Sequence, residues 1–286
     1  MKKIIKILFP ESIKTYFRKL ENFFLRLHYG FSNPVILSDI FSIKFILYPE
    51  QQTPIRWLIE RGAYKKEYSA FNTLIRSNYT VFDVGSHIGI VACYLCKIVG
   101  ENGSVHSFEP FPDSYNRLNE NIVINDYKNI KTNQVAISDK IGNQIFYYEP
   151  SNWELNSLGS VSNGSNRLNK KINVEVNTID NYCEKNKISK INFLKIDTEG
   201  YEINVLRGSE KMLKNKSIDL IQFEISKIPL ESLDRRPDEI ILFLKDKGYF
   251  VYEYLESENK FHKINDIVTD YDNYYASYKN IELSHD

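Results

Sequence analysis

The sequence predicts an α/β fold with a doubly wound, mostly parallel sheet, on three observations. A β-branched and aromatic run, 79–83, leads through a glycine turn into an apolar run with helical spacing, 90–99. The same alternation of strand and helix continues through 104–108, 112–125 and 130–137. Two apolar runs, 191–197 and 218–224, each end on an acid. Right-handed crossovers place the ends of such strands along one edge of the sheet, where ligands bind.

Length and composition limit the remaining possibilities. A chain of 286 residues can bury one good core. We assign residues 1–62 to an N-terminal extension of helices and a β-hairpin, and residues 63–286 to the main domain. Lys plus Arg and Asp plus Glu both total 37, and this balance argues against a nucleic-acid partner. Three cysteines form neither a disulfide framework nor a metal set, which predicts a cytoplasmic protein.

The N-terminal extension is basic. Its first 30 residues carry seven Lys or Arg against Glu11 and Glu21 and are expected to form one or two amphipathic helices. The apolar run 4–9 is too short to span a bilayer, and no cleavage site follows it. Two interpretations stay open: peripheral contact with the inner face of a membrane, or packing on the main domain. We expect a hairpin over 34–47, followed by helices over 53–59 and 64–77.

The glycine turn is the predicted cofactor site. Gly85 and Gly89 let a ligand approach the backbone at a helix N-terminus. The spacing differs from the dinucleotide pattern G-x-G-x-x-G, and Asp83 beside it would repel a pyrophosphate and attract an amine. Glu109 ends the next strand about twenty residues later, where an acid can bind ribose hydroxyls. An ammonium, a sulfonium and a ribose without phosphate describe S-adenosylmethionine. A nicotinamide-dependent reductase, or the ordinary turn of an α/β domain, is the alternative.

Residues near these two positions complete the predicted cofactor site. Ser86 and His87 lie inside the glycine turn. Phe111 follows the ribose acid and is expected either to stack on adenine or to belong to the core. The backbone around Ala136 is expected to close the other side of the adenine site.

Three acids form the predicted catalytic group. Asp197 and Glu199 follow one strand, and Glu224 ends the next, so they should meet where the donor methyl points. Asp197 or Glu224 is expected to act as general base, or all three to bind Mg²⁺. The structural alternative is that they cap the following helix or pair with Lys195.

Further elements follow the same logic. The runs 144–148 and 172–176 alternate with period two and predict an antiparallel pair. The polar segment 149–171 between them is either an acceptor-facing flap or disordered. Helices are expected over 203–213 and 237–247, a strand over 249–255 and a final antiparallel strand over 273–279.

Four short blocks together resemble the FkbM-type family of S-adenosylmethionine-dependent methyltransferases. They are FDVGSHIG at 82–89, SFEP at 107–110, VAISD at 135–139 and LKIDTEG at 194–200. The resemblance covers roughly residues 68–278 and implies a class I methyltransferase (Rossmann-like) sheet. It implies methyl transfer to a hydroxyl oxygen of a sugar or a secondary metabolite.

The resemblance also assigns roles to residues. Asp83, Gly85 and Gly89 would hold the methionine part of the cofactor and Glu109 the ribose, with Pro110 beside it. Asp197 and Glu199 would mark the acidic turn of the family. The family often has Ala-Asn where this chain has Ser86 and His87.

The predicted activity is therefore O-methylation of a sugar or glycan hydroxyl. A small secondary metabolite is the alternative acceptor, and a non-catalytic adaptor with the same fold is a further alternative. Neutral charge and the 20 Tyr and 17 Phe fit a carbohydrate better than RNA.

Overall fold

The computed structural model describes residues 35–38, 41–48, 64–148, 156–159, 170–266 and 271–281. The chain divides into two compact units, Met1–Tyr64 and Lys65–Asp286. In the first unit β1 (Val35–Ser38) and β2 (Lys44–Leu47) pair antiparallel, which confirms the predicted hairpin. The helices predicted over 1–30 and 53–59 lie outside the described residues. None of the helices in the described ranges is long and apolar enough to cross a membrane.

Within the described residues, the second unit is built on an eight-stranded sheet of order β12-β11-β13-β10-β9-β3-β4-β5. Its strands are β3 (Thr80–Val84), β4 (Ser104–Phe108), β5 (Ile130–Asn133), β9 (Ile191–Ile196), β10 (Ile218–Ser226), β11 (Phe250–Leu255), β12 (Lys260–Ile264) and β13 (Tyr271–Ser277). The strands from β5 to β10 run parallel, and β13, β11 and β12 join antiparallel. The α/β class and the antiparallel final strand are confirmed.

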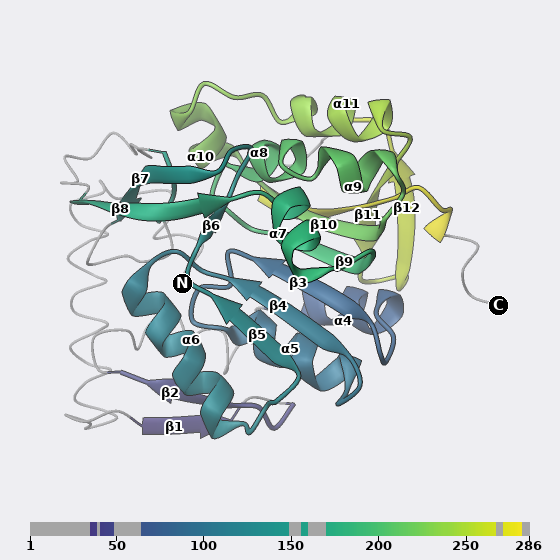
Figure 1. Ribbon diagram of the computed structural model, residues 1–286. Coiled ribbons are helices and arrows are strands. Elements are labelled where there is room, and N and C mark those ends of the chain that lie inside the picture. Colours follow the sequence, from purple (N-terminus) through teal and green to yellow (C-terminus); the bar gives the residue numbers. More distant parts are fainter. Residues whose placement is uncertain are drawn as a thin grey trace, which may run out of the picture. The chain divides into compact units, whose positions relative to one another are not determined.

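Helices cover both faces of this sheet (Figure 1). One face carries α4 (Lys65–Leu74), α5 (Ile90–Val99) and α6 (Pro112–Ile124). The opposite face carries α7 (Ile179–Asn186), α8 (Glu202–Arg207), α9 (Glu210–Lys214) and α11 (Asp238–Asp246). A further short helix, α10 (Lys227–Ser232), follows β10 directly. Apolar side chains of the strands and of the helices on this second face form a continuous buried core.

The predicted strand over 130–137 was wrong as one element. The chain leaves the central sheet after β5, and β6 (Ala136–Ile137) pairs with β8 (Lys170–Asn177) in a separate three-stranded sheet. In that sheet β7 (Gly142–Tyr148) pairs antiparallel with β8, which confirms the predicted pair. The separation arises because Ala136 and Ile137 are buried in different apolar clusters, whereas β5 is a half-exposed edge strand.

The helix predicted over 203–213 is also broken, into α8 and α9. Gly208 lies at the break, where an added Cβ would collide with the carbonyl oxygen of Ser138. The chain therefore turns at Gly208 so that its backbone can pass close to the segment after β6.

Candidate active site

Two rows of side chains cross the central sheet on the face that α4 and α5 cover. Neighbours in strand register form the first, which we call the inner row: Ser107, Asp83, Lys195 and Gln222. Alternate residues of a strand point to the same face, so the residues two positions later form a second row at the carboxyl ends of the strands. This is the edge row: Glu109, Gly85, Asp197 and Glu224. The sheet register therefore brings the predicted cofactor acid Glu109 and the predicted catalytic acids to one edge.

The two glycines of the turn are required by the packing of the chain itself. Gly85 has φ +83°, and an added Cβ would collide with the carbonyl oxygen of Asp197. Gly89 has φ +85° and directly precedes α5, where a Cβ would lie 2.5 Å from Leu118 Cδ1 of α6. Residues other than glycine rarely adopt this left-handed backbone conformation. The turn thus holds the ends of β3 and β9 in close contact, and the edge row depends on it.

Ser86 and His87 have different environments within the turn. Ser86 is buried, and its Oγ donates to the carbonyl oxygen of Asp83 at 2.8 Å and accepts from Ser107 Oγ at 2.5 Å. Its side chain is therefore used inside the fold. His87 Nε2 is also buried but has no hydrogen-bond partner among the residues that the structure covers. Burial lowers the pKa of His87 to about 4, so its imidazole is neutral near pH 7.

Glu109 joins the turn to the segment after β4. Its Oε2 accepts from the backbone N–H of His87 at 2.9 Å, and its Oε1 accepts from that of Phe111 at 2.8 Å. Burial raises the pKa of Glu109 to about 7, against the opposing effect of these two bonds. Each carboxylate oxygen retains a second lone pair for a ligand hydroxyl.

Phe111 and Ala136 lie in a compact apolar cluster. Phe111 is 4% exposed and packs against Phe146 and Tyr148 of β7, with ring centroids 6.4 and 4.9 Å away. Ala136 belongs to the same cluster. Pro110, between Glu109 and this cluster, is half-buried. The packing corresponds to the core alternative for Phe111, and its stacking on adenine stays a prediction.

A buried lysine, Lys195, connects the two rows. Its Nζ lies 2.8 Å from Asp197 Oδ2 and 3.8 Å from Asp83 Oδ1. Asp83 is fully buried, and no group in the described part of the chain donates a hydrogen bond to either of its carboxylate oxygens. Burial raises the pKa of the Asp83 carboxyl, against the effect of Lys195. Burial alone would lower the pKa of Lys195, but the neighbouring acids raise it overall, so the ammonium stays charged.

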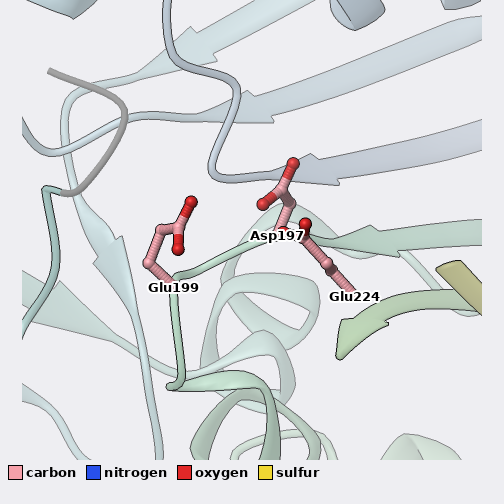
Figure 2. Close-up of side chains that lie close together, drawn as sticks. All are labelled: Asp197, Glu199 and Glu224. Carbon is pink, nitrogen blue, oxygen red and sulfur yellow. The ribbon is translucent and has the colours of Figure 1, made fainter. Parts of the chain in front are cut away.

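The structure brings together the three predicted catalytic residues. Ligand oxygens of Asp197, Glu199 and Glu224 all lie within 4.8 Å of one another, and Figure 2 shows the Asp197 and Glu224 carboxyls side by side. The Asp197 and Glu224 carboxyls are close enough to share a hydrogen bond. Burial acts to raise the pKa of Asp197, but Lys195 and this hydrogen bond hold it below its ordinary value.

The predicted capping of the following helix is provided by a different acid, Glu202. Glu202 Oε1 accepts from the backbone N–H groups of Thr198 at 3.0 Å and Gly200 at 3.1 Å. Glu199 lies within this turn with φ +51°, a strained conformation for a side chain other than glycine. Glu202 thus accepts the hydrogen bonds of the backbone N–H groups in this turn. Capping of these groups therefore does not explain why Asp197, Glu199 and Glu224 lie together. The predicted alternative of pairing with Lys195 is observed for Asp197.

One part of the predicted flap contacts this acidic turn. Of the segment 149–171, the structure describes 156–159 and the start of β8, and the rest lies outside the described residues. Ser157 Oγ lies 2.9 Å from the carbonyl oxygen of Glu199, to which it donates a hydrogen bond. Residues 156–159 are thus attached beside the predicted catalytic acids, and the role of an acceptor-facing flap stays a prediction.

Sequence reasoning missed Glu67 of α4 and Gln222 of β10. Glu67 is 6% exposed, and its Oε1 accepts from Gln222 Nε2 at 2.7 Å. The sequence did contain a signal, because Glu67 shares helical spacing with the buried residues Ala70, Phe71 and Leu74. An acid on the apolar stripe of a helix needs a buried partner.

The pKa of Glu67 makes a prediction about stability. Burial raises this pKa to about 7 from its ordinary value of 4.5. Between these values the folded protein keeps a proton that the unfolded chain has lost, so the free energy of unfolding falls as pH rises. The free energy of unfolding of E67Q, relative to that of wild type, should therefore rise by roughly 2–3 kcal/mol as the pH increases from 4 to 8. Urea unfolding across this range measures it, and a difference that does not vary with pH would contradict the assigned shift.

The chain is similar in sequence to known methyltransferases. Residues 83–251, more than half of the chain, match the family described as the methyltransferase FkbM domain. Hexuronic acid methyltransferase AglP of Haloferax volcanii is 30% identical over 144 residues, 50% of this chain and 54% of that protein. The match thus spans only about half the length of that relative.

Two other proteins are more distantly similar. Methyltransferase sdnD of Sordaria araneosa is 26% identical over 205 residues, covering 60% of this chain and 74% of that protein. A solved structure of an S-adenosylmethionine-dependent methyltransferase from Aquifex aeolicus shares 17% identity over 79% of this chain and 92% of that one, with a TM-score of 0.44, too low to establish a shared fold. The family match, which begins at Asp83 and contains the glycine turn, Glu109 and the acidic turn, confirms the resemblance: the chain belongs to the FkbM methyltransferase domain family.

Proposed function

We propose that the protein is an S-adenosylmethionine-dependent O-methyltransferase that acts on a hydroxyl group of a sugar. One observation carries the proposal: the edge row places the hydrogen-bonded pair of Asp197 and Glu224 beside the glycine turn and Glu109. Family membership supports methyl transfer, and the similarity to the hexuronic acid methyltransferase AglP supports a sugar acceptor. A secondary metabolite as acceptor is the alternative.

The residues of the turn fit a cationic, phosphate-free donor. Asp83 offers two buried carboxylate oxygens that accept no hydrogen bond from the described residues, and His87 offers a buried Nε2 in the same situation. We assign to Glu109 the acceptance of hydrogen bonds from ribose hydroxyls, because each of its carboxylate oxygens keeps a lone pair beside the turn. The pyrophosphate of a nicotinamide dinucleotide would meet the acids Asp83 and Glu109 and would be repelled.

The chain has two tasks in the proposed reaction: it positions the acceptor hydroxyl and it removes the proton of that hydroxyl. S-adenosylmethionine supplies an electrophilic methyl group when bound. The chain must hold the acceptor oxygen about 3 Å from that methyl, in line with the sulfur. As the new O–C bond forms and the S–C bond breaks, the hydroxyl proton passes to Asp197. Lys195, 2.8 Å from Asp197, keeps this carboxylate ionised until the acceptor arrives.

A Mg²⁺ ion held by Asp197, Glu199 and Glu224 is the second candidate for activating the hydroxyl. The spacing of these acids favours it. Asp197, however, already pairs with Lys195 and is hydrogen-bonded to Glu224, and a cation would have to displace both partners. We therefore prefer the base. Methyl transfer that survives treatment with EDTA supports the base, and transfer that EDTA abolishes and Mg²⁺ restores supports the metal.

Substitution of Glu109 tests the cofactor site. At pH 8, above the Glu109 pKa of about 7, E109A should weaken binding of S-adenosylhomocysteine by about 1–3 kcal/mol, because hydrogen bonds from the ribose to a charged group are lost. Isothermal titration calorimetry measures this. E239A is the matched control, because Glu239 lies on α11, on the opposite face of the sheet, and pairs with Arg207. Equal affinity of E109A and wild type would refute the ribose role.

The decisive experiment compares cofactors and then acceptors. Calorimetry with S-adenosylhomocysteine and with NADH separates the methyltransferase from a reductase, and binding of NADH alone would overturn the proposal. Transfer of a radiolabelled methyl group is then measured with methyl glucuronoside and methyl glucoside as probes. Transfer to either supports a sugar acceptor. If neither is methylated while S-adenosylhomocysteine binds, the sugar assignment falls and the secondary metabolite takes its place.

A further inference from the structure

Glu67 lies outside the region that matches the FkbM domain, yet it reaches the inner row. The match begins at Asp83, whereas Glu67 belongs to α4, the helix that precedes β3. The Glu67 side chain is buried, and Gln222 Nε2 donates to its Oε1 at 2.7 Å. A residue from another part of the chain therefore completes the group of buried polar side chains beneath the edge row.

The strand register places Gln222 next to Lys195, and Lys195 next to Asp83. Lys195 thus lies between two polar neighbours of the inner row, and Glu67 of α4 is hydrogen-bonded to one of them, Gln222. Its Nζ contacts Asp197 at 2.8 Å, two residues further along the same strand. The hydrogen bond between Gln222 and Glu67, and the strand register that sets Gln222 beside Lys195, thus connect α4 to the edge row.

Stability gives little reason for such a group of residues. Removing several charges from water is costly, and buried ion pairs are often no more stabilising than well-packed apolar side chains of similar volume. Buried ionisable groups beside a cluster of acids are more typical of a working site. A lysine ammonium is carried on a flexible four-carbon stem. Neighbouring side chains must therefore restrict this stem if the ammonium is to stay in contact with one particular carboxylate.

We propose that Glu67 is a positioning residue of the active site. Together with Gln222 it fixes the Lys195 ammonium, and Lys195 fixes the Asp197 carboxylate that accepts the hydroxyl proton. The assignment of that last step rests on the proposed function, whereas the fixing of Lys195 can be tested without an acceptor.

The variants E67Q and E67A separate charge from hydrogen bonding. At pH 8, above the Glu67 pKa of about 7, E67Q retains an oxygen that can accept from Gln222 but removes the negative charge of Glu67, and E67A removes both. K66Q is the matched control on the same helix, because Lys66 contacts Asp272 of β13 at 2.7 Å and does not belong to the inner row. If α4 only needs to be held in place, K66Q should reproduce the effects of E67Q.

The direct measurement is the proton–nitrogen correlation signal of the Lys195 ammonium in isotope-labelled protein. Burial slows exchange of its protons with water, and K195R, which keeps the charge, identifies the signal by its loss. We expect this signal to shift or broaden in E67Q, to change more in E67A and to stay unchanged in K66Q. An unchanged signal in both Glu67 variants, or an equal change in K66Q, would overturn the proposal.

Kinetics provide the second measurement. With a glycoside that the wild-type enzyme methylates, E67Q should lower kcat by about 10–100-fold, the scale for misplacing a reacting group. The KM for S-adenosylmethionine should stay unchanged. A rise in that KM with unchanged kcat would overturn the proposal. If wild type methylates neither glycoside while the ammonium signal responds to E67Q, the sugar assignment fails and the fixing of Lys195 by Glu67 stands.

Discussion

Replacement of Asp197 by asparagine should lower kcat for methyl transfer by about 10²–10⁴-fold, the usual contribution of a positioned general base. The amide cannot take the hydroxyl proton, although its size and its place in the edge row are retained. Among the residues that the structure describes, Asp197 is the carboxylate that contacts both Lys195 and Glu224. Initial rates at saturating S-adenosylmethionine measure the effect.

Two variants make this result specific. E224Q should also lower kcat, because Glu224 shares the hydrogen bond with Asp197. D219N should leave kcat essentially unchanged, since Asp219, near the start of β10, contacts Lys190 and Tyr278 instead. Binding of S-adenosylhomocysteine by all three variants shows that the cofactor site is intact. Full activity in D197N would remove Asp197 from the base role.

Replacement of Lys195 by methionine should destabilise the fold by about 3–5 kcal/mol, the scale for breaking a buried ion pair from one side. The ammonium is the cation that contacts both Asp83 and Asp197. Without it Asp83 remains fully buried with no hydrogen bond from the described residues to either oxygen. The free energy of unfolding in urea at neutral pH measures the loss.

K190M is the control for this substitution. Lys190 pairs with Asp219 at 2.8 Å, but 49% of its side chain is exposed. Exposed ion pairs contribute about 0–1 kcal/mol, so K190M should change the free energy of unfolding far less than K195M. A similar, small change in both variants would mean that Asp83 and Asp197 do not depend on Lys195.

Much of the fold could be predicted because its signals are local. The alternation of strand and helix, the glycine turn after β3 and the acids at the ends of β4 and β9 all lie within short stretches of sequence. Parallel strands with right-handed crossovers then place those ends at one edge. Asp197, Glu199 and Glu224 were expected together for this reason, and their oxygens lie within 4.8 Å of one another.

The sequence alone determined the α/β class, the position of the glycine turn, the acids of the edge row and the family to which the chain belongs. Only the tertiary structure decided that Lys195 lies between Asp83 and Asp197, that Glu67 approaches from α4, and that the chain leaves the central sheet after β5. The physical reason is the range of the interactions. Turns and strand ends follow from neighbouring residues, whereas the partner of a buried charge depends on strand register and helix packing between distant segments.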